Sequence, residues 1–154
     1  MKTIYFDMDG TIVNFYSVDN WLKKLTIEDS SPYEDALPLL DINRLEDLLL
    51  KLKSMGYNLG IITWSSKYSS EKFIHKVKIS KENWIKKYFK KIQFDEFVIL
   101  DYSCNKASSV KDPFGILFDD DFMIRKNWPG KSYPPECIFP VLSELVGEEF
   151  NEKF

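Results

Sequence analysis

Short apolar runs alternate with amphipathic segments along this chain, and the alternation predicts its architecture. Residues 3–8 are β-branched, aromatic or otherwise mostly apolar, which is typical of a strand buried on both faces. Residues 41–55 repeat apolar side chains at helical spacing, with Asp41 suited to the N-cap and Gly56 to the position after the end. A second strand is predicted over residues 58–64.

The second half of the chain continues the same pattern. Residues 70–91 have helical spacing and are predicted to form two pieces, with Ser80 as the cap of the second. Further strands are predicted over residues 94–100, 115–118 and 137–139. Further helices are predicted over residues 122–128 and 141–150.

Strands that alternate with helices favour right-handed βαβ units and a parallel sheet. The expected fold is therefore α/β, a three-layer Rossmann-like sheet with helices on both faces. Residues 1–154 are assigned to a single domain. A small insertion or flap is expected at about residues 12–40, since this stretch lacks a strong period and exceeds the roughly 2–6 residues of a simple βα connection.

Composition and charge exclude several classes of protein. Apolar residues make up 44% of the chain and the net charge is −3, so a folded core is expected and a global preference for nucleic acid or membrane is not. No apolar run approaches the roughly 18 residues of a membrane span, and the first one is too short for a signal peptide. The 2 cysteines exclude a disulfide scaffold and the single histidine, His75, a His-rich metal site. A reducing cytoplasm is the expected compartment.

Two carboxylates stand at the end of the first predicted strand, in the run Asp7-Met8-Asp9-Gly10-Thr11. Residues i and i+2 of a strand share a face, so Asp7 and Asp9 can converge where Gly10 permits a turn. Because adjacent anions repel, the arrangement indicates a divalent metal and phosphate chemistry. An acidic turn is the simpler interpretation of such a run, whereas an EF-hand is excluded because no ladder of ligands follows.

Other polar residues are expected at the same edge of the sheet. Thr63 and the pair Asp119-Asp120 fall at or just after the ends of predicted strands. Ligands of parallel sheets bind at the carboxyl ends of strands, so these residues are candidates for the same site. Asp121 extends the acidic run and is interpreted as the N-terminal residue of the next helix.

These residues resemble the motifs of the haloacid dehalogenase-like (HAD) superfamily of phosphatases and phosphotransferases. The first motif, an apolar strand followed by Asp-x-Asp-Gly-Thr, is matched by residues 7–11. The second, an apolar strand that ends in Thr or Ser, is matched by residues 60–63. The resemblance covers nearly the whole chain, and the first and fourth motifs are the specific ones.

The third and fourth motifs lie in the second half of the chain. The third is a lysine that opens a helix, for which Lys106 is the better candidate and Lys111 the alternative. The fourth is an apolar strand that ends in paired acids, matched by Asp119-Asp120, with a slip to Asp120-Asp121 left open.

The resemblance implies a Mg²⁺-dependent phosphomonoester hydrolase. Asp7 would attack phosphorus to form an aspartyl-phosphate, and Asp9 would act as general acid and then as general base. Thr63 would donate a hydrogen bond to the phosphoryl group, and Lys106 would neutralise its charge. The implied metal residues are Asp7, Asp9 through its main-chain carbonyl, Asp120, and Asp119 in support.

The substrate is expected to be a small phosphate ester. The residues predicted to bind it are Gly10, Thr11, Trp64 and Ser65, with Phe15, Tyr16 and Trp21 as candidates to line the entrance. Trp64 either stacks on a substrate ring or simply packs. Since the insertion is too small for the cap domain of larger HAD members, a nearly capless enzyme is expected, with some likeness to small nucleotidase-like members. No membrane contact is expected, and the oligomeric state is not predicted.

A lysine-rich segment leaves a second substrate class open. It contains Lys67, Lys72, Lys76, Lys78, Lys81, Lys86, Lys87, Lys90 and Lys91. These lysines are interpreted as a solvated helix face whose aliphatic stems cover apolar surface. The alternative is a surface for a polyanion such as a nucleic-acid end.

Two further functions also stay open. A HAD-like module that binds phosphate or metal without turnover would keep the same residues. A metal-independent dehalogenase would use the aspartate nucleophile alone, but Asp9 and the Asp119-Asp120 pair argue against it.

Overall fold

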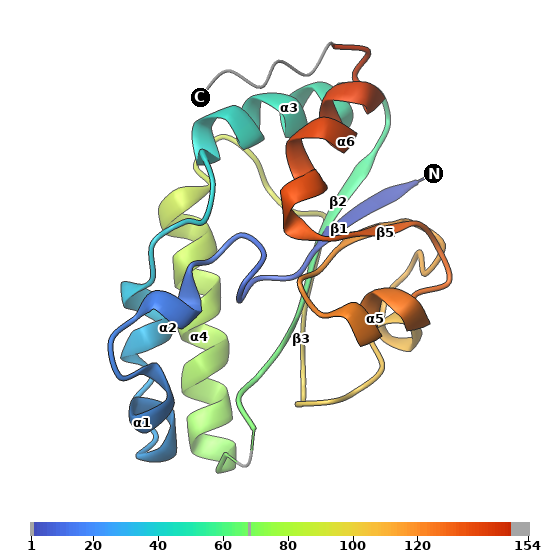
Figure 1. Cartoon of the computed structure of the whole chain (residues 1–154). Helices are drawn as coiled ribbons and strands as arrows, with labels where there is room; N and C mark the ends of the chain where they lie inside the picture. Colours follow the sequence, from blue (N-terminus) through green and yellow to red (C-terminus); the bar gives the residue numbers. More distant parts are fainter. Residues whose placement is uncertain (1, 68, 149–154) are drawn as a thin grey trace.

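A parallel sheet forms the centre of the protein. In the computed structural model, which describes residues 2–67 and 69–148, this sheet has 5 strands in the order β3-β2-β1-β4-β5 (Figure 1). The strands are β1 (Thr3–Phe6), β2 (Asn58–Trp64), β3 (Glu96–Leu100), β4 (Ile116–Phe118) and β5 (Ser132–Tyr133). The predicted α/β class and the first four predicted strands are confirmed.

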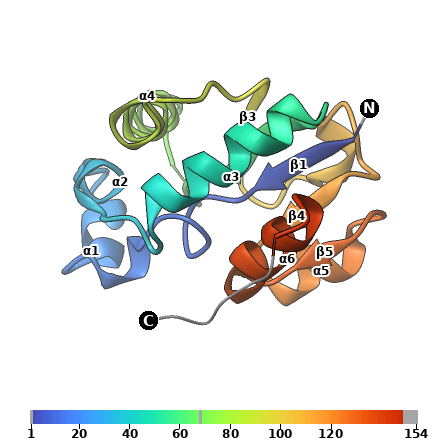
Figure 2. The same ribbon diagram turned by 90° about the horizontal axis from the view of Figure 1, so that it is seen from above.

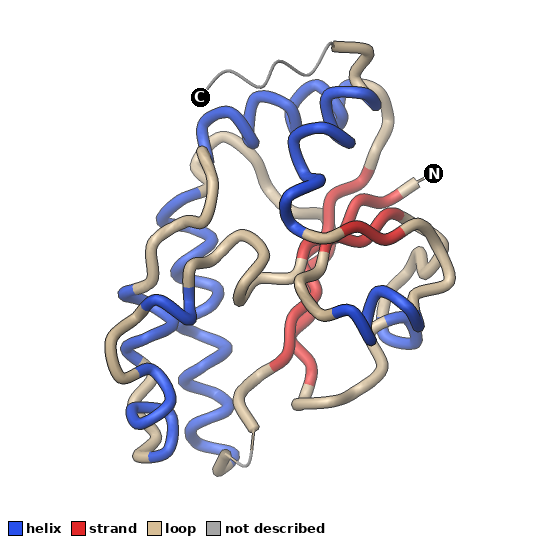
Figure 3. Tube along the Cα trace, viewed as in Figure 1, coloured by secondary structure: helices blue, strands red, loops and turns tan. Residues whose placement is uncertain are grey.

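Helices cover both faces of the sheet, whose strands run through the middle of the molecule (Figure 3). The helices are α1 (Trp21–Thr26), α2 (Ser31–Asp35), α3 (Ile42–Ser54), α4 (Glu71–Tyr88), α5 (Phe122–Asn127) and α6 (Ile138–Leu145). Residues of α3, α4 and α6 pack into one core, whereas Ile124 of α5 packs against the other, so α5 covers the opposite face of the sheet. Figure 2 shows these elements from above. Within the described ranges, no helix is both long and apolar enough to cross a membrane.

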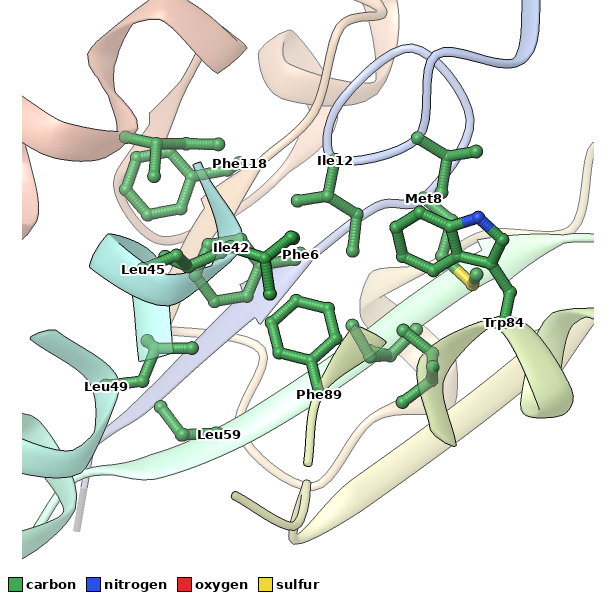
Figure 4. Packing of buried hydrophobic residues seen from close by; sticks show 14 of the residues in the cluster. Phe6, Met8, Ile12, Ile42, Leu45, Leu49, Leu59, Trp84, Phe89 and Phe118 are labelled. Atoms are coloured by element: carbon green, nitrogen blue, oxygen red, sulfur yellow. The ribbon is translucent and has the colours of Figure 1, made fainter. Parts of the chain in front are cut away.

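Alternate side chains of β1 enter two separate cores. Ile4 and Phe6 join the larger core, which α3, α4 and α6 cover, whereas Tyr5 lies in a smaller core with Trp128. Figure 4 shows part of the larger core, where Phe6 lies among residues of α3 and Phe89. Since both faces are covered, every position of β1 is apolar or buried, which is why the strand shows no alternation of apolar and polar residues.

The insertion predicted at about residues 12–40 is anchored at both ends. The N–H of Leu39 donates to the Ile12 carbonyl (2.9 Å), and the N–H of Asn14 donates to the Leu37 carbonyl (2.8 Å). In the segment between Asn14 and Leu37, α2 packs against α4, and α1 packs against α2 (Figure 1). The insertion therefore forms a fixed wall next to the carboxyl end of β1.

Contacts with α4 hold that wall in place. The indole of Trp84 on α4 donates to the carbonyl of Ala36 (2.8 Å), and the hydroxyl of Ser80 donates to Glu34 (3.1 Å). The prediction of two helical pieces over residues 70–91 is wrong, because α4 is continuous and Ser80 lies inside it rather than at a cap. A serine is tolerated inside a helix when its hydroxyl has a hydrogen-bond partner outside that helix, and Glu34 is this partner for Ser80.

The end of the chain differs from the prediction in its boundaries. The fifth strand is Ser132–Tyr133, whereas residues 137–139 close a 3-10 turn and begin α6. A short apolar run fits a buried helix as well as a strand, and Pro140 in the first turn of α6 costs no helical hydrogen bond. The helix predicted over residues 141–150 ends at Leu145, and residues 149 and 150 lie outside the described residues.

Candidate active site

The carboxyl ends of β1, β2 and β4 bring the predicted site residues together. The register of β1 and β4 pairs Phe6 with Phe118, so the next residues, Asp7 and Asp119, end side by side. β2 lies on the other side of β1, and Thr63 is near its end. A cavity of about 590 Å³ at this edge is lined by, among others, Asp7, Asp9, Thr63, Trp64, Ser65, Lys106, Asp119 and Asp120.

Lys106 joins the two buried carboxylates at the bottom of the site. Its Nζ donates to Asp7 Oδ1 (3.0 Å) and to Asp119 Oδ2 (2.7 Å). Burial opposes the charged form of this lysine, but the two adjacent carboxylates outweigh burial and raise the pKa of Lys106 above its usual value. Lys111, the alternative, is exposed and uses its backbone N–H to donate to Glu96 (3.0 Å).

Gly10 and Thr11 fix the distance between the first and fourth motifs. Gly10 has a φ of +80°, and a Cβ there would lie 2.4 Å from Asp120 Oδ2, so the position requires glycine. The hydroxyl of Thr11 donates to Asp7 Oδ2 (3.2 Å) and accepts from the backbone N–H of Asp120 (3.2 Å). Both residues thus order the carboxylates, and the substrate contacts predicted for them stay predictions.

Asp121 differs from the other two residues of the acidic run, because it caps a helix. Its carboxylate accepts the backbone N–H groups of Met123 (2.8 Å) and Ile124 (3.2 Å) and so caps α5. The interpretation of Asp121 as a helix N-terminal residue is confirmed. The paired acids that face Asp7 are Asp119 and Asp120.

These three carboxylates are spaced for a metal ion. Oxygens of Asp7, Asp119 and Asp120 all lie within 4.8 Å of one another. Removal from water raises the pKa of Asp119 to about 6 and that of Asp120 to about 7, and the negative charge of Asp7 adds to both shifts. A hard divalent cation such as Mg²⁺ takes carboxylate oxygens as ligands and would relieve this repulsion, so the donor set fits Mg²⁺.

A second buried lysine, not predicted as part of the site, contacts Asp9. Lys81 on α4 is 1% exposed, and its Nζ donates to Asp9 Oδ2 (3.0 Å), Thr63 Oγ1 (2.7 Å) and the Trp64 carbonyl (2.8 Å). Burial raises the pKa of Asp9 above its usual value, although the charge of Lys81 opposes that shift. The interpretation of Lys81 as part of a solvated face is wrong.

A sequence signal for Lys81 exists in its register. The buried residues Val77 and Trp84 lie four positions before it and three after it, so all three share one face of α4. A lysine in line with apolar positions on a helix is a candidate for a buried charge, even inside a lysine-rich segment.

The net charge of the site is suited to a divalent cation. Among the described residues of the cluster, the carboxylates of Asp7, Asp9, Asp119 and Asp120 meet the two ammonium groups of Lys81 and Lys106. Two negative charges are therefore left when all four acids are ionised. One Mg²⁺ ion would balance them.

Ser65 and Trp64 approach the cavity from the end of β2. The Ser65 hydroxyl is buried without a hydrogen-bond partner among the described residues, although the residue lines the cavity. Such an atom is costly unless a ligand or water satisfies it. The Trp64 indole donates to the Cys104 carbonyl (2.9 Å), and its ring lies 5.2 Å from that of Tyr102.

The insertion supplies an aromatic wall to the same cavity, formed by Phe15, Tyr16, Trp21 and Tyr33. Phe15 stacks on Tyr33 with ring centroids 4.7 Å apart, and Tyr16 meets Trp21 edge-on at 5.1 Å. The structure thus places Phe15, Tyr16 and Trp21 on the cavity, as expected. The nearby carboxylates add to the effect of burial and raise the pKa of the Tyr16 hydroxyl.

Comparison with known proteins identifies the fold. The structure matches the crystal structure of a D,D-heptose 1,7-bisphosphate phosphatase from Burkholderia thailandensis, with a TM-score of 0.52 over 96% of this chain and 100% of that one. The protein has a HAD-like fold. At 8% sequence identity the match shows the HAD-like fold alone. No family model matches the chain, and no curated protein does.

The raised carboxyl pKa values make the metal-free protein sensitive to pH. Unfolded aspartates titrate near about 4, whereas Asp119 and Asp120 do so near about 6 and about 7 in the folded protein. The folded state therefore binds more protons between these values, and its stability should rise as the pH falls from about 8 to about 5. We expect the thermal midpoint of unfolding, measured in EDTA, to rise as the pH is lowered from about 8 to about 5.

Asp120→Asn is the matched control for this expectation. It removes one of the carboxyl groups with a raised pKa, so the rise in thermal midpoint should become smaller. Mg²⁺ should stabilise the wild type more at about pH 8 than at about pH 5, because protons compete with the metal for the carboxylates. A midpoint in EDTA that stays flat or falls on acidification would contradict this account of the site.

Proposed function

We propose that the protein is a Mg²⁺-dependent phosphomonoester hydrolase that acts through an aspartyl-phosphate on Asp7. The observation that carries the proposal is the placement of Asp7 in one cavity with Lys106, Asp9 and the Asp119-Asp120 pair. The HAD-like fold, shared with a solved phosphatase, supports phosphoryl chemistry at this edge of the sheet.

Asp7 is held as a nucleophile from two sides. Lys106 donates to its Oδ1 and Thr11 to its Oδ2, so the carboxylate has a fixed orientation. An oriented carboxylate can attack phosphorus to give an acyl-phosphate that water later hydrolyses. Lys106 uses two of its three N–H bonds on Asp7 and Asp119, which leaves one for a phosphoryl oxygen.

Asp9 is suited to move the proton. Its raised pKa favours a protonated carboxyl that can donate to the leaving oxygen, and the resulting carboxylate can then accept a proton from the attacking water. Mg²⁺, held by Asp7, Asp120 and the main-chain carbonyl of Asp9 with support from Asp119, would supply positive charge that offsets the phosphate. Thr63 and Ser65 line the same cavity and would bind phosphoryl oxygens.

The substrate we propose is a small phosphate ester that carries a flat ring, such as a nucleoside monophosphate. A volume of about 590 Å³ lies within the range of small-molecule pockets, which favours a small molecule over a nucleic-acid end. The aromatic wall and the Trp64–Tyr102 pair offer ring surfaces on which a base can stack. The lysine-rich segment is also less suited to bind a polyanion than its composition indicated, because Lys81 is buried and cannot contact one.

Asp7→Asn tests the nucleophile. We expect phosphate release from p-nitrophenyl phosphate with Mg²⁺ to fall by at least about 10³-fold, with a thermal midpoint close to that of the wild type. Asp35→Asn is the control, because Asp35 is exposed at the end of α2. Wild-type activity in Asp7→Asn would refute the mechanism.

Two further measurements separate the alternative functions. Hydrolysis of a haloacid that survives EDTA would support the metal-independent dehalogenase. Binding of Mg²⁺ and inorganic phosphate without turnover across a broad panel of phosphate esters would support the silent binding module.

Tyr16→Leu and Tyr102→Leu test the ring-binding part of the proposal. Loss of one stacking surface should raise KM for a nucleoside monophosphate by about 3- to 10-fold and leave KM for glycerol phosphate nearly unchanged. Phe114→Leu is the control, since Phe114 is 70% exposed and does not line the cavity. An equal change for both esters would show that these rings do not select the substrate.

A further inference from the structure

Lys81 has no counterpart among the motif residues, yet it contacts two of them. We infer that Lys81 is a positioning residue that orients Asp9 for proton transfer and Thr63 for phosphoryl binding. This inference rests on the proposed phosphatase function and assigns a residue that the four motifs do not contain.

The burial of Lys81 needs a reason. An ammonium group withdrawn from water is costly unless charge and hydrogen bonds compensate it, and a lysine would be unexpected between Val77 and Trp84 on the inner face of α4. All three N–H bonds of Lys81 are satisfied, by Asp9, Thr63 and the Trp64 carbonyl. No N–H is left for a substrate, so Lys81 must act through the groups that it holds.

Thr63 is oriented by this contact. Its Oγ1 accepts from Lys81 at 2.7 Å, and a hydroxyl has only one hydrogen to donate. That hydrogen must point away from Lys81, and Thr63 lines the cavity. The threonine is thereby prepared to donate to a phosphoryl oxygen rather than to a protein group.

Asp9 is oriented in the same way. Lys81 engages its Oδ2 at 3.0 Å and leaves Oδ1 as the oxygen that can carry the transferable proton. Without this ion pair, the carboxyl group could rotate, and the proton would be presented to the leaving oxygen in only part of the molecules. Proton transfer requires hydrogen-bond reach in the reacting complex, so a loss of orientation lowers the rate.

The fold keeps Lys81 in place from several sides. α4 is capped by Ser70, whose side chain accepts from the N–H of Phe73 (3.2 Å). The ring of Tyr33, from the insertion, lies with its centroid 5.2 Å from Lys81 Nζ and adds a cation–π contact. Each aspartate of the first motif thus pairs with its own lysine: Asp7 with Lys106, and Asp9 with Lys81.

A pair of esters with the same ring tests the inference. Phenyl phosphate has a poor leaving group that needs a proton, whereas p-nitrophenyl phosphate has a good one that needs it less. Both present one ring to the aromatic wall. The ratio of their kcat/KM values, measured on one preparation, is independent of the fraction of folded enzyme.

We expect Lys81→Met to lower the ratio of phenyl to p-nitrophenyl phosphate hydrolysis by roughly 10-fold or more, as loss of general acid help predicts. Lys81→Arg keeps the buried charge, and hence the fold, but its planar fork cannot reproduce the three contacts. Its ratio should fall to a value between those of Lys81→Met and the wild type. Lys86→Met, on the exposed face of the same helix, should leave the ratio unchanged.

Two outcomes would overturn the inference. The first would also reject the proposed function, whereas the second would not. If the wild type with Mg²⁺ hydrolyses neither ester, the proposed function fails and the role of Lys81 fails with it. If the wild type hydrolyses both esters and the Lys81 variants slow both by the same factor, Lys81 has a structural role only, and the proposed function stands.

Discussion

Carboxylates that the parallel sheet forces together are the constraint on which the rest of this structure depends. Asp7 and Asp119 directly follow neighbouring strands in register, and Asp9, two residues after Asp7, lines the same cavity. Their repulsion must be balanced, because buried anions are costly. Lys106 and Lys81 reach the cluster from separate segments of the chain and balance part of it. The remaining negative charge is what makes the site suited to a divalent cation.

The insertion at about residues 12–40 completes the site, although it lies far in the sequence from the Asp119-Asp120 pair. Its aromatic residues form one wall of the cavity, and one of them, Tyr33, also covers Lys81. A wall fixed to α4 encloses the cavity without a separate cap domain. Under the proposed function, ring selection and proton transfer would be linked through Tyr33, because this residue both lines the aromatic wall and covers the ammonium group of Lys81.

Local geometry explains which features could be predicted from the sequence. Asp7 and Asp9 follow from the period of a strand, and their meeting with Thr63 follows from the parallel arrangement of strand ends. Lys81 could not be predicted from its lysine-rich surroundings, because only its register on the helix distinguishes it from its exposed neighbours. The run at residues 137–139 is too short for periodicity to separate a strand from a helix, so tertiary packing decided it.

Covalent capture of the phosphoryl group tests whether Asp7 is the nucleophile. Wild-type protein is mixed with Mg²⁺ and a radiolabelled phosphate ester, quenched in acid within milliseconds, digested and examined by mass spectrometry. We expect a labelled, acid-stable and base-labile phosphate on Asp7, with less label after longer incubation as substrate is consumed. Turnover with no phosphate on Asp7, or with the phosphate on another residue, would show that Asp7 is not the nucleophile.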